Sequence, residues 1–295
     1  MSHAFINTPQ LYIGTAGWSY DDWVGSFYPF TQSKEFSWLK YYSRYFNMVE
    51  VNSTYYTYLA PNIVNSWLRQ IENADDFLFT MKLHKDFTHK RQYGNNQIKA
   101  VQQNLNILKR EERLGGLLLQ FPYSFDFNDA NVNYLRELIQ KFDGYEKFVE
   151  VRHRSWQNKK AKTITFCTID QPQIGESIEF KPIVGNDAAY IRFHGRNEEA
   201  WRKSLSNFGK KQTYEQQSAR YEYLYSPGEL TEIDQKLKEI YDKVKKVFVV
   251  MNNHPHGDAV ANAFELLHLL KDRVKIKIPP TIIKSYPRLK EFNQN

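Results

Sequence analysis

The chain is poor in cysteine: Cys167 is the only one among its 295 residues. A lone thiol excludes an intrachain disulfide, and no zinc-finger spacing is present. Residues 1–10 lack a basic segment followed by an apolar stretch, so we expect no signal peptide. No apolar run is long enough to cross a bilayer, so we expect no membrane partner. These absences together predict a cytoplasmic protein.

Glycine-rich phosphate loops are absent as well, both the Walker type and Gly-x-Gly-x-x-Gly, so no cofactor is predicted. The formal net charge is +7 at pH 7, which raises the odds of a polyanionic partner. The basic residues are scattered, however, with only short clusters such as Lys243 to Lys246. A basic surface is therefore the simpler interpretation, and a nucleic-acid partner has weak support.

The composition is that of a folded protein, with 41% hydrophobic and 16% aromatic residues. Neither a linker nor a low-complexity stretch divides the chain, so a single domain over residues 1–295 is predicted. Eight apolar runs predict strands: Leu11–Gly17, Met48–Thr54, Phe77–His84, Gly116–Pro122, Lys147–Arg152, Ile164–Asp170, Ala188–Gly195 and Val247–Asn253.

Amphipathic segments with helical spacing lie between most of these runs. Eight strands with intervening helices predict an α/β fold, a (β/α)8 TIM-like barrel; a doubly wound open sheet is the alternative. The segment from Gln157 to Thr163 is too short for a full helix. An irregular or missing helix is therefore expected between strands five and six.

Charged or amide residues spaced two apart end several strands, as in Glu50 and Asn52, Glu150 and Arg152, and Arg192 and His194. Side chains two apart share a face of a strand, and barrel active sites lie at the carboxyl ends of the strands. Continuing the alternation predicts an inward ring of residues, with Cys167 on the outward, helix-facing side. The ring comprises Thr15 or Trp18, Glu50, Asn52, Lys82, Gln120, Glu150, Arg152, Asp170, Arg192, His194, and Asn252 or Asn253.

The charges in this ring nearly cancel, since three carboxylates face Lys82, Arg152 and Arg192. Three cations oppose a metal cage, which favours a small polar ligand with an anionic group. The two arginines could clamp a phosphate or carboxylate. Glu50, Glu150, His194 and Asp170 are the candidate acids and bases; Thr15, Trp18, Asn52, Lys82, Gln120, Arg152, Arg192, Asn252 and Asn253 are the candidate substrate-binding residues.

A set of short motifs runs through most of the chain: Gly14–Tyr20 with Trp23 and Phe27–Pro29, Glu50–Tyr56, Lys82 with Thr88-His89, Gln120–Pro122, Glu150–Arg152 with Trp156, Asp170, Tyr190–Gly195, and Asn252-Asn253. Together these motifs resemble those of the domain of unknown function 72 family (YecE-like). The resemblance implies a TIM-like barrel and no established reaction. The chain departs from the family pattern at Met251, where the family prefers Phe, and in the shortened segment from Gln157 to Thr163.

Three functions remain open at this point. The first is an enzyme, a hydrolase, isomerase or lyase, that applies general acid–base chemistry to a small anionic metabolite. The second is a metal-dependent phosphodiester hydrolase or nuclease, with a divalent metal on Glu50, Glu150, Asp170 and His194. The third is a protein that binds a ligand at the same mouth without turnover. A structural ion-pair network is the alternative for any one of these residues taken alone.

Overall fold

The structure is a computed structural model that describes residues 9–159, 164–185, 187–206 and 213–294. Nine strands pair in parallel throughout. They are β1 (Gln10–Thr15), β2 (Met48–Val51), β3 (Leu78–Lys82), β4 (Leu114–Gln120), β5 (Lys147–Glu150), β6 (Thr165–Phe166), β7 (Thr168–Asp170), β8 (Ala188–Phe193) and β9 (Lys246–Met251). Every predicted strand forms, and the sixth is split in two.

Two sheets make up the ring of strands, in the orders β1-β9-β8-β7 and β2-β3-β4-β5-β6. A parallel bridge between Ala16 and Glu50 joins β1 to β2, where the Gly17 amide donates to the Glu50 carbonyl at 2.8 Å. Cys167 links β6 to β7, and its amide donates to the Val149 carbonyl at 2.9 Å. The predicted TIM-like α/β arrangement is confirmed, with seams at these two places.

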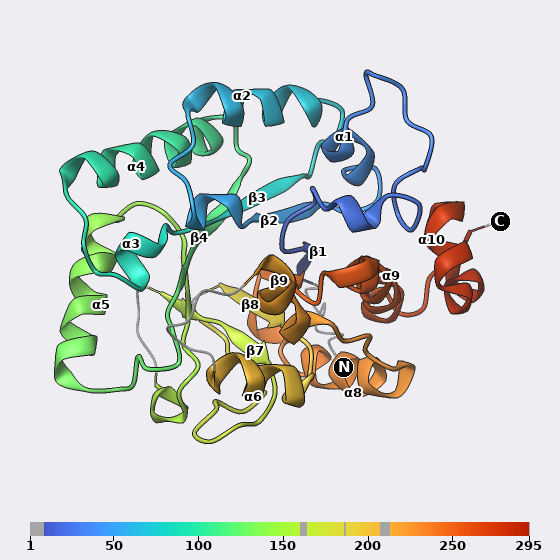
Figure 1. Cartoon of the computed structure of the whole chain (residues 1–295). Coiled ribbons are helices and arrows are strands. Elements are labelled where there is room, and N and C mark those ends of the chain that lie inside the picture. Colours follow the sequence, from blue (N-terminus) through green and yellow to red (C-terminus); the bar gives the residue numbers. More distant parts are fainter. Residues whose placement is uncertain (1–8, 160–163, 186, 207–212, 295) are drawn as a thin grey trace, which may run out of the picture.

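Helices lie outside the strands (Figure 1). They are α1 (Trp38–Tyr42), α2 (Pro61–Gln70), α3 (Lys85–Thr88), α4 (Asn95–Arg110), α5 (Asp129–Lys141), α6 (Glu198–Ser206), α7 (Tyr214–Ser218), α8 (Pro227–Lys238), α9 (Asp258–Leu270) and α10 (Pro280–Ser285). Between β5 and β6 the described residues hold only the 3-10 turn Arg154–Trp156, as expected for a reduced helix. No described helix is long and apolar enough to cross a membrane.

The last barrel helix, α9, is buried along its whole length. It packs on β1 and β9 with one side, and the C-terminal turn Pro287–Phe292 packs against it as well. The Arg288 guanidinium donates to Glu265 at 2.7 Å across this contact. A helix covered on all sides needs an apolar sequence, and α9 has one, with Ala, Val, Phe and Leu at most positions.

The lower interior of the barrel is filled by aromatic rings. Phe148 stacks on Tyr190 with ring centroids 4.3 Å apart, and Tyr12 stacks on Phe248 at 5.0 Å. Residues two positions further along β5 and β8 are Glu150 and Arg192. Alternation therefore places charged side chains directly above an apolar layer that excludes water. This arrangement puts the chemistry of the barrel at the carboxyl ends of its strands.

Candidate functional site

Arg192 on β8 lies at the centre of the barrel interior and is 1% exposed. Its Nε donates to Glu50 Oε2 at 2.8 Å, its Nη2 donates to Glu50 Oε1 at 2.6 Å, and its Nη1 donates to Glu150 Oε2. The Tyr190 hydroxyl also donates to Glu50 Oε2, at 2.9 Å. One guanidinium therefore holds two carboxylates from opposite sides of the ring, in the bidentate geometry that arginine favours.

Glu150 on β5 is the second junction. Arg152 Nε donates to Glu150 Oε1 at 2.9 Å, and His194 Nε2 lies 3.2 Å from the same oxygen. The Asn252 amide nitrogen lies 2.9 Å from His194 Nδ1. An amide nitrogen can only donate, so Nδ1 accepts, and the ring hydrogen sits on Nε2 and faces Glu150. We call Glu50, Glu150, Arg152, Arg192 and His194 the ion-pair floor.

The ionisation of the floor follows from burial and pairing. Burial opposes the charge of Glu150, but Arg192, His194 and Arg152 together hold the pKa of its carboxyl well below its usual range. Burial lowers the pKa of His194 to about 3, so its imidazole is neutral. Two carboxylates balance the two guanidiniums of Arg152 and Arg192. The floor is therefore closed and electrically neutral.

Lys82, at the end of β3, faces the mouth above the floor. Its Nζ lies 4.5 Å from the centre of the Tyr55 ring, and no carboxylate of the described residues lies at ion-pair distance from it. Burial first, and then Arg192, lower the pKa of the Lys82 ammonium to about 8. Lys82 is therefore a cation held beside an aromatic ring without a counter-ion.

Arg220 and Tyr221 come from the 3-10 turn Ala219–Tyr221, which follows α7. Arg220 Cζ lies 4.8 Å from the Tyr221 ring and 5.5 Å from the Trp201 ring, and Trp201 also lies 5.1 Å from Arg152 Cζ. Within the described part of the chain, Arg220 has no ion pair. We call Lys82, Arg220 and Tyr221 the cationic rim.

The rim changes the acidity of its own tyrosine. Burial raises the pKa of Tyr221, but Arg220, Arg152 and Lys82 outweigh it and lower the pKa to about 8. His89 lies in the same field: burial, Lys82 and Arg152 lower its pKa to about 4, so it is neutral. Lys82 and Tyr221 therefore each change protonation state close to neutral pH.

The profile of the family described as "Protein of unknown function DUF72" matches residues 12–284. The chain belongs to the DUF72 family. UPF0759 protein YunF of Bacillus subtilis (strain 168) is 30% identical over 279 residues, which cover 88% of this chain and 95% of YunF. UPF0759 protein YecE of Escherichia coli (strain K12) is 28% identical over 145 residues, 49% of each chain.

Solved DUF72 structures have the same fold. A DUF72 protein of Thermotoga maritima MSB8 is 33% identical, has a TM-score of 0.75, and matches 89% of this chain and 99% of its own. A DUF72 protein of Enterococcus faecalis V583 is 23% identical with a TM-score of 0.72, over 89% of this chain and 96% of its own. These relatives share the architecture and carry no named reaction.

The placement of Asp170 in the ring of this DUF72 protein is wrong. Asp170 Oδ1 accepts from the Tyr225 hydroxyl at 2.7 Å and from Arg196 Nε at 2.9 Å, and its Oδ2 accepts from Arg196 Nη2 at 2.7 Å. Thr168, two residues earlier, turns its hydroxyl to the Ile183 amide in the outer loop. Asp170 shares that outward face and does not reach the ion-pair floor.

The prediction that Cys167 points outward, toward the helices, is also wrong. Burial raises the pKa of its thiol, and the interior charges of Glu150, Arg192 and Glu50 act on it. Cys167 therefore faces the barrel interior. Phe166 packs on Trp156 of the outer 3-10 turn, so the alternation continues through Cys167 and the odd positions of β6 and β7 point inward.

Thr15 and Asn253 also lie outside the ring. The Thr15 hydroxyl bonds the Tyr42 hydroxyl of α1 at 3.0 Å and the Gly17 carbonyl at 2.6 Å. Asn253 Nδ2 donates to Asn262 Oδ1 on α9 at 2.9 Å, whereas its neighbour Asn252 points inward to His194. Of the two alternatives after β9, the structure selects Asn252.

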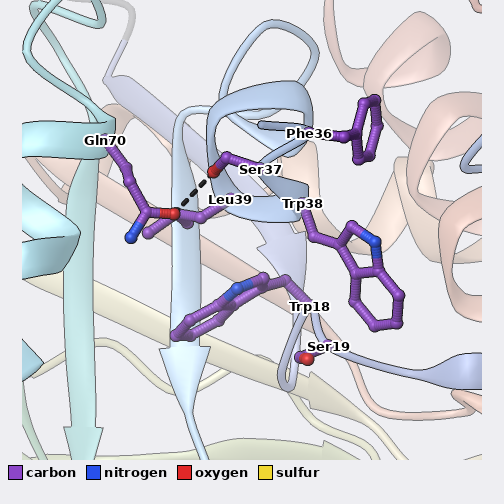
Figure 2. A pocket seen from close by; sticks show the side chains of 7 residues that line it. All are labelled: Trp18, Ser19, Phe36, Ser37, Trp38, Leu39 and Gln70. Atoms are coloured by element: carbon purple, nitrogen blue, oxygen red, sulfur yellow. Dashed lines mark hydrogen bonds between the residues drawn. The ribbon is translucent and has the colours of Figure 1, made fainter. Parts of the chain in front are cut away.

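Trp18 lies with a different pocket. Figure 2 shows its indole beside Ser37, Trp38 and Gln70, in a shallow pocket of about 420 Å³ whose lining carries no charged side chain. Its ring also meets Trp67 edge-on at 5.4 Å. This pocket lies between the loop after β1 and helices α1 and α2, so Trp18 belongs to the helical shell rather than to the ring.

Asn52 and Gln120 keep positions at the strand ends. Gln120 pairs in register with Glu150, and its amide nitrogen donates to the Phe121 carbonyl at 3.1 Å. Asn52 follows β2, and its Oδ1 is a buried acceptor without a hydrogen-bond partner. Of the residues predicted for the ring, Glu50, Glu150, Arg152, Arg192, His194 and Asn252 form one bonded cluster, and Lys82 lies above it.

The sequence interpretation missed Arg220, Tyr221 and Trp201. They lie in the long connection after β8, on α6 and a 3-10 turn, rather than at a strand end. Strand periodicity therefore carries no signal for them. The one local feature that indicates a contribution of this connection to the mouth is the basic residue Arg220 next to the aromatic residue Tyr221.

Proposed function

We propose that this protein is an enzyme that applies general acid–base chemistry to a small anionic metabolite at the carboxyl-terminal mouth of the barrel. The observation that carries the proposal is the pair of unpartnered cations, Lys82 and Arg220, above a neutral floor. Both residues are partly buried, and a cation partly shielded from water without a counter-ion is costly. A phosphate or carboxylate group of the ligand supplies that counter-ion.

Proton transfer falls to the rim in this proposal. Lys82 and Tyr221 each have a pKa of about 8, which suits an acid and a base that work near neutral pH. Glu50, Glu150 and His194, which the sequence suggested for this role, are fully buried and already bonded. Their proposed role is to hold Arg152 and Arg192 in place beneath the ligand.

The two alternative functions are a metal-dependent hydrolase and a binding protein without turnover. No group of three or more His, Cys, Asp or Glu in the described ranges could hold a metal ion. The proposed metal alternative loses its ligand set, because Asp170 points away and the arginines occupy Glu50 and Glu150. A binding protein without turnover uses the same rim, so an activity screen on the ligands that bind separates it from the enzyme.

Removal of one rim cation should weaken anion binding. We expect inorganic phosphate and a panel of sugar phosphates and oxo acids to raise the melting temperature of the wild type. Lys82→Met and Arg220→Met should each cost about 1.5–3 kcal/mol of binding, a loss of roughly tenfold to a hundredfold. Lys85→Met is the matched control, because its Nζ also lies over a tyrosine ring, 5.6 Å from Tyr56. Equal affinities in all variants would contradict the proposal.

Anion binding should also depend on pH, with a defined sign. Lys82 carries its charge below about pH 8 and loses it above, and Tyr221 becomes an anion over the same range. Both changes weaken anion binding as the pH rises. We expect the affinity for sulfate, whose own charge is constant over this range, to be steady below the pKa of Lys82 and to fall above it, measured by calorimetric titration. Binding that strengthens as the pH rises through this range would count against the assignment.

A further inference from the structure

We propose that Lys82 is a covalent nucleophile whose Nζ forms an imine with a ketone or aldehyde group of the bound metabolite. The inference rests on the proposed function and narrows its substrate class to carbonyl compounds that also carry a phosphate or carboxylate. The reaction then belongs to the lyases or isomerases rather than to the hydrolases, because an imine serves to withdraw electrons from a neighbouring carbon.

The surroundings of Lys82 distinguish it from Lys147, a buried lysine on the helix-facing side of β5. Lys147, at the start of β5, is buried with its Nζ donating to the carbonyls of Phe142 at 3.2 Å and Tyr145 at 2.8 Å. Lys82, at the opposite end of the barrel, has the Tyr55 ring at 4.5 Å and no hydrogen-bond acceptor among the described residues. Its amine is therefore free to react and lies at the mouth rather than under it.

The nearest charges keep Lys82 from forming an ion pair. Arg192 faces it from β8, and Glu50 and Glu150 face it from β2 and β5, but the arginines already occupy both carboxylates. Tyr55, Tyr221 and the neutral His89 also face it. A lysine that is desolvated and placed beside another cation is the arrangement that activates an amine as a nucleophile.

The step balances without an oxidant or reductant. The neutral amine attacks the carbonyl carbon, the C–N bond forms, and the carbonyl electron pair moves to oxygen, which takes a proton from the Tyr221 phenol. The nitrogen of the resulting carbinolamine returns a proton to the Tyr221 phenolate. The hydroxyl then leaves as water with the proton that the Lys82 ammonium released to solvent when it became the neutral amine. Overall, Lys82 ammonium and the carbonyl compound give a protonated imine and one water.

Acetylacetone tests this assignment on the full-length protein, because it converts an imine-forming lysine into a stable adduct and carries no negative charge. At neutral pH, a lysine with a pKa of about 8 has roughly two hundred times the neutral fraction of an ordinary one. We expect Lys82 to be labelled at least tenfold faster than any other lysine. Intact mass should rise by one probe minus one water, with the site located by peptide mapping.

Matched variants complete the experiment. Lys147→Arg should keep the fast adduct, and Lys82→Arg should lose it while phosphate still raises its melting temperature. If Lys82 is labelled no faster than surface lysines, the imine proposal is wrong. If phosphate still raises the melting temperature in that case, the proposed anion site is not contradicted. The labelling rate should level off above about pH 8, and a rate that keeps rising toward the pKa of a free lysine also overturns the proposal.

Discussion

Replacing Arg192 with methionine is expected to destabilise the folded protein by about 3–5 kcal/mol, because it leaves two buried carboxylates without their partner. Glu50 and Glu150 are both fully buried, and Arg192 bonds each of them. Urea denaturation at neutral pH measures the loss. Arg202→Met is the control, since Arg202 makes an exposed pair with Glu198 on α6, and we expect a change within about 0.5 kcal/mol.

The deficit of Arg192→Met should shrink as the pH falls. In the wild type, the pKa of Glu150 lies well below its usual range, so its contribution to stability is present above the unfolded value of about 4.3. That contribution is lost only as the pH falls through the lower folded value. Without Arg192, the carboxyl of Glu150 loses the largest influence that lowers its pKa, so it protonates at a higher pH than in the wild type and the cost is relieved. A deficit that grows toward acidic pH would contradict this account of the floor.

Gly14→Ala is the second substitution with a large expected effect. A Cβ at Gly14 would overlap the Met48 carbonyl oxygen and the Tyr42 hydroxyl, so the backbone of β1 and β2 must separate. Tyr42 links the same strands, because its hydroxyl donates to Met48 O at 3.1 Å and accepts from the Thr15 amide at 2.8 Å. We expect a loss of roughly 3 kcal/mol or more.

The matched control is Gly228→Ala at the start of α8, where an added Cβ meets no atom. Alanine favours a helix over glycine, so this variant should be as stable as the wild type or up to about 1 kcal/mol more stable. Thermal unfolding of the two variants side by side measures the difference. Equal stabilities would show that the seam between β1 and β2 tolerates opening, and the closed ring would then be the wrong description.

Much of the fold follows from short-range pattern. The eight apolar runs became strands because their residues favour pleated backbone, and period-two spacing put Glu50, Glu150, Arg192 and His194 on inward faces. The same rule failed at Asp170 because alternation says which residues share a face but not which face is inward, and here the odd positions are inward. The prediction for Thr15 failed because its hydroxyl bonds the Tyr42 hydroxyl at the seam between β1 and β2 and does not point into the ring.

The contacts between distant segments could not be read in this way. The sequence predicts a charge-balanced ring but does not say which carboxylate pairs with which cation. Arg192 bonds Glu50 across 142 positions of the chain and Glu150 across 42, and closure of the barrel alone brings these strands together. Arg220 and Tyr221 lie in the long connection after β8, so the periodicity of the strands could not predict that they reach the mouth.

The sequence by itself therefore determined the order of strands, the residues at their carboxyl ends and the sign of each charge, because backbone geometry acts over a few residues. Only the tertiary structure decided which charges neutralise one another and which stay unpartnered. That outcome depends on distances across the barrel. The closed floor uses up both glutamates, and Lys82 and Arg220 are left as the cations available to a ligand.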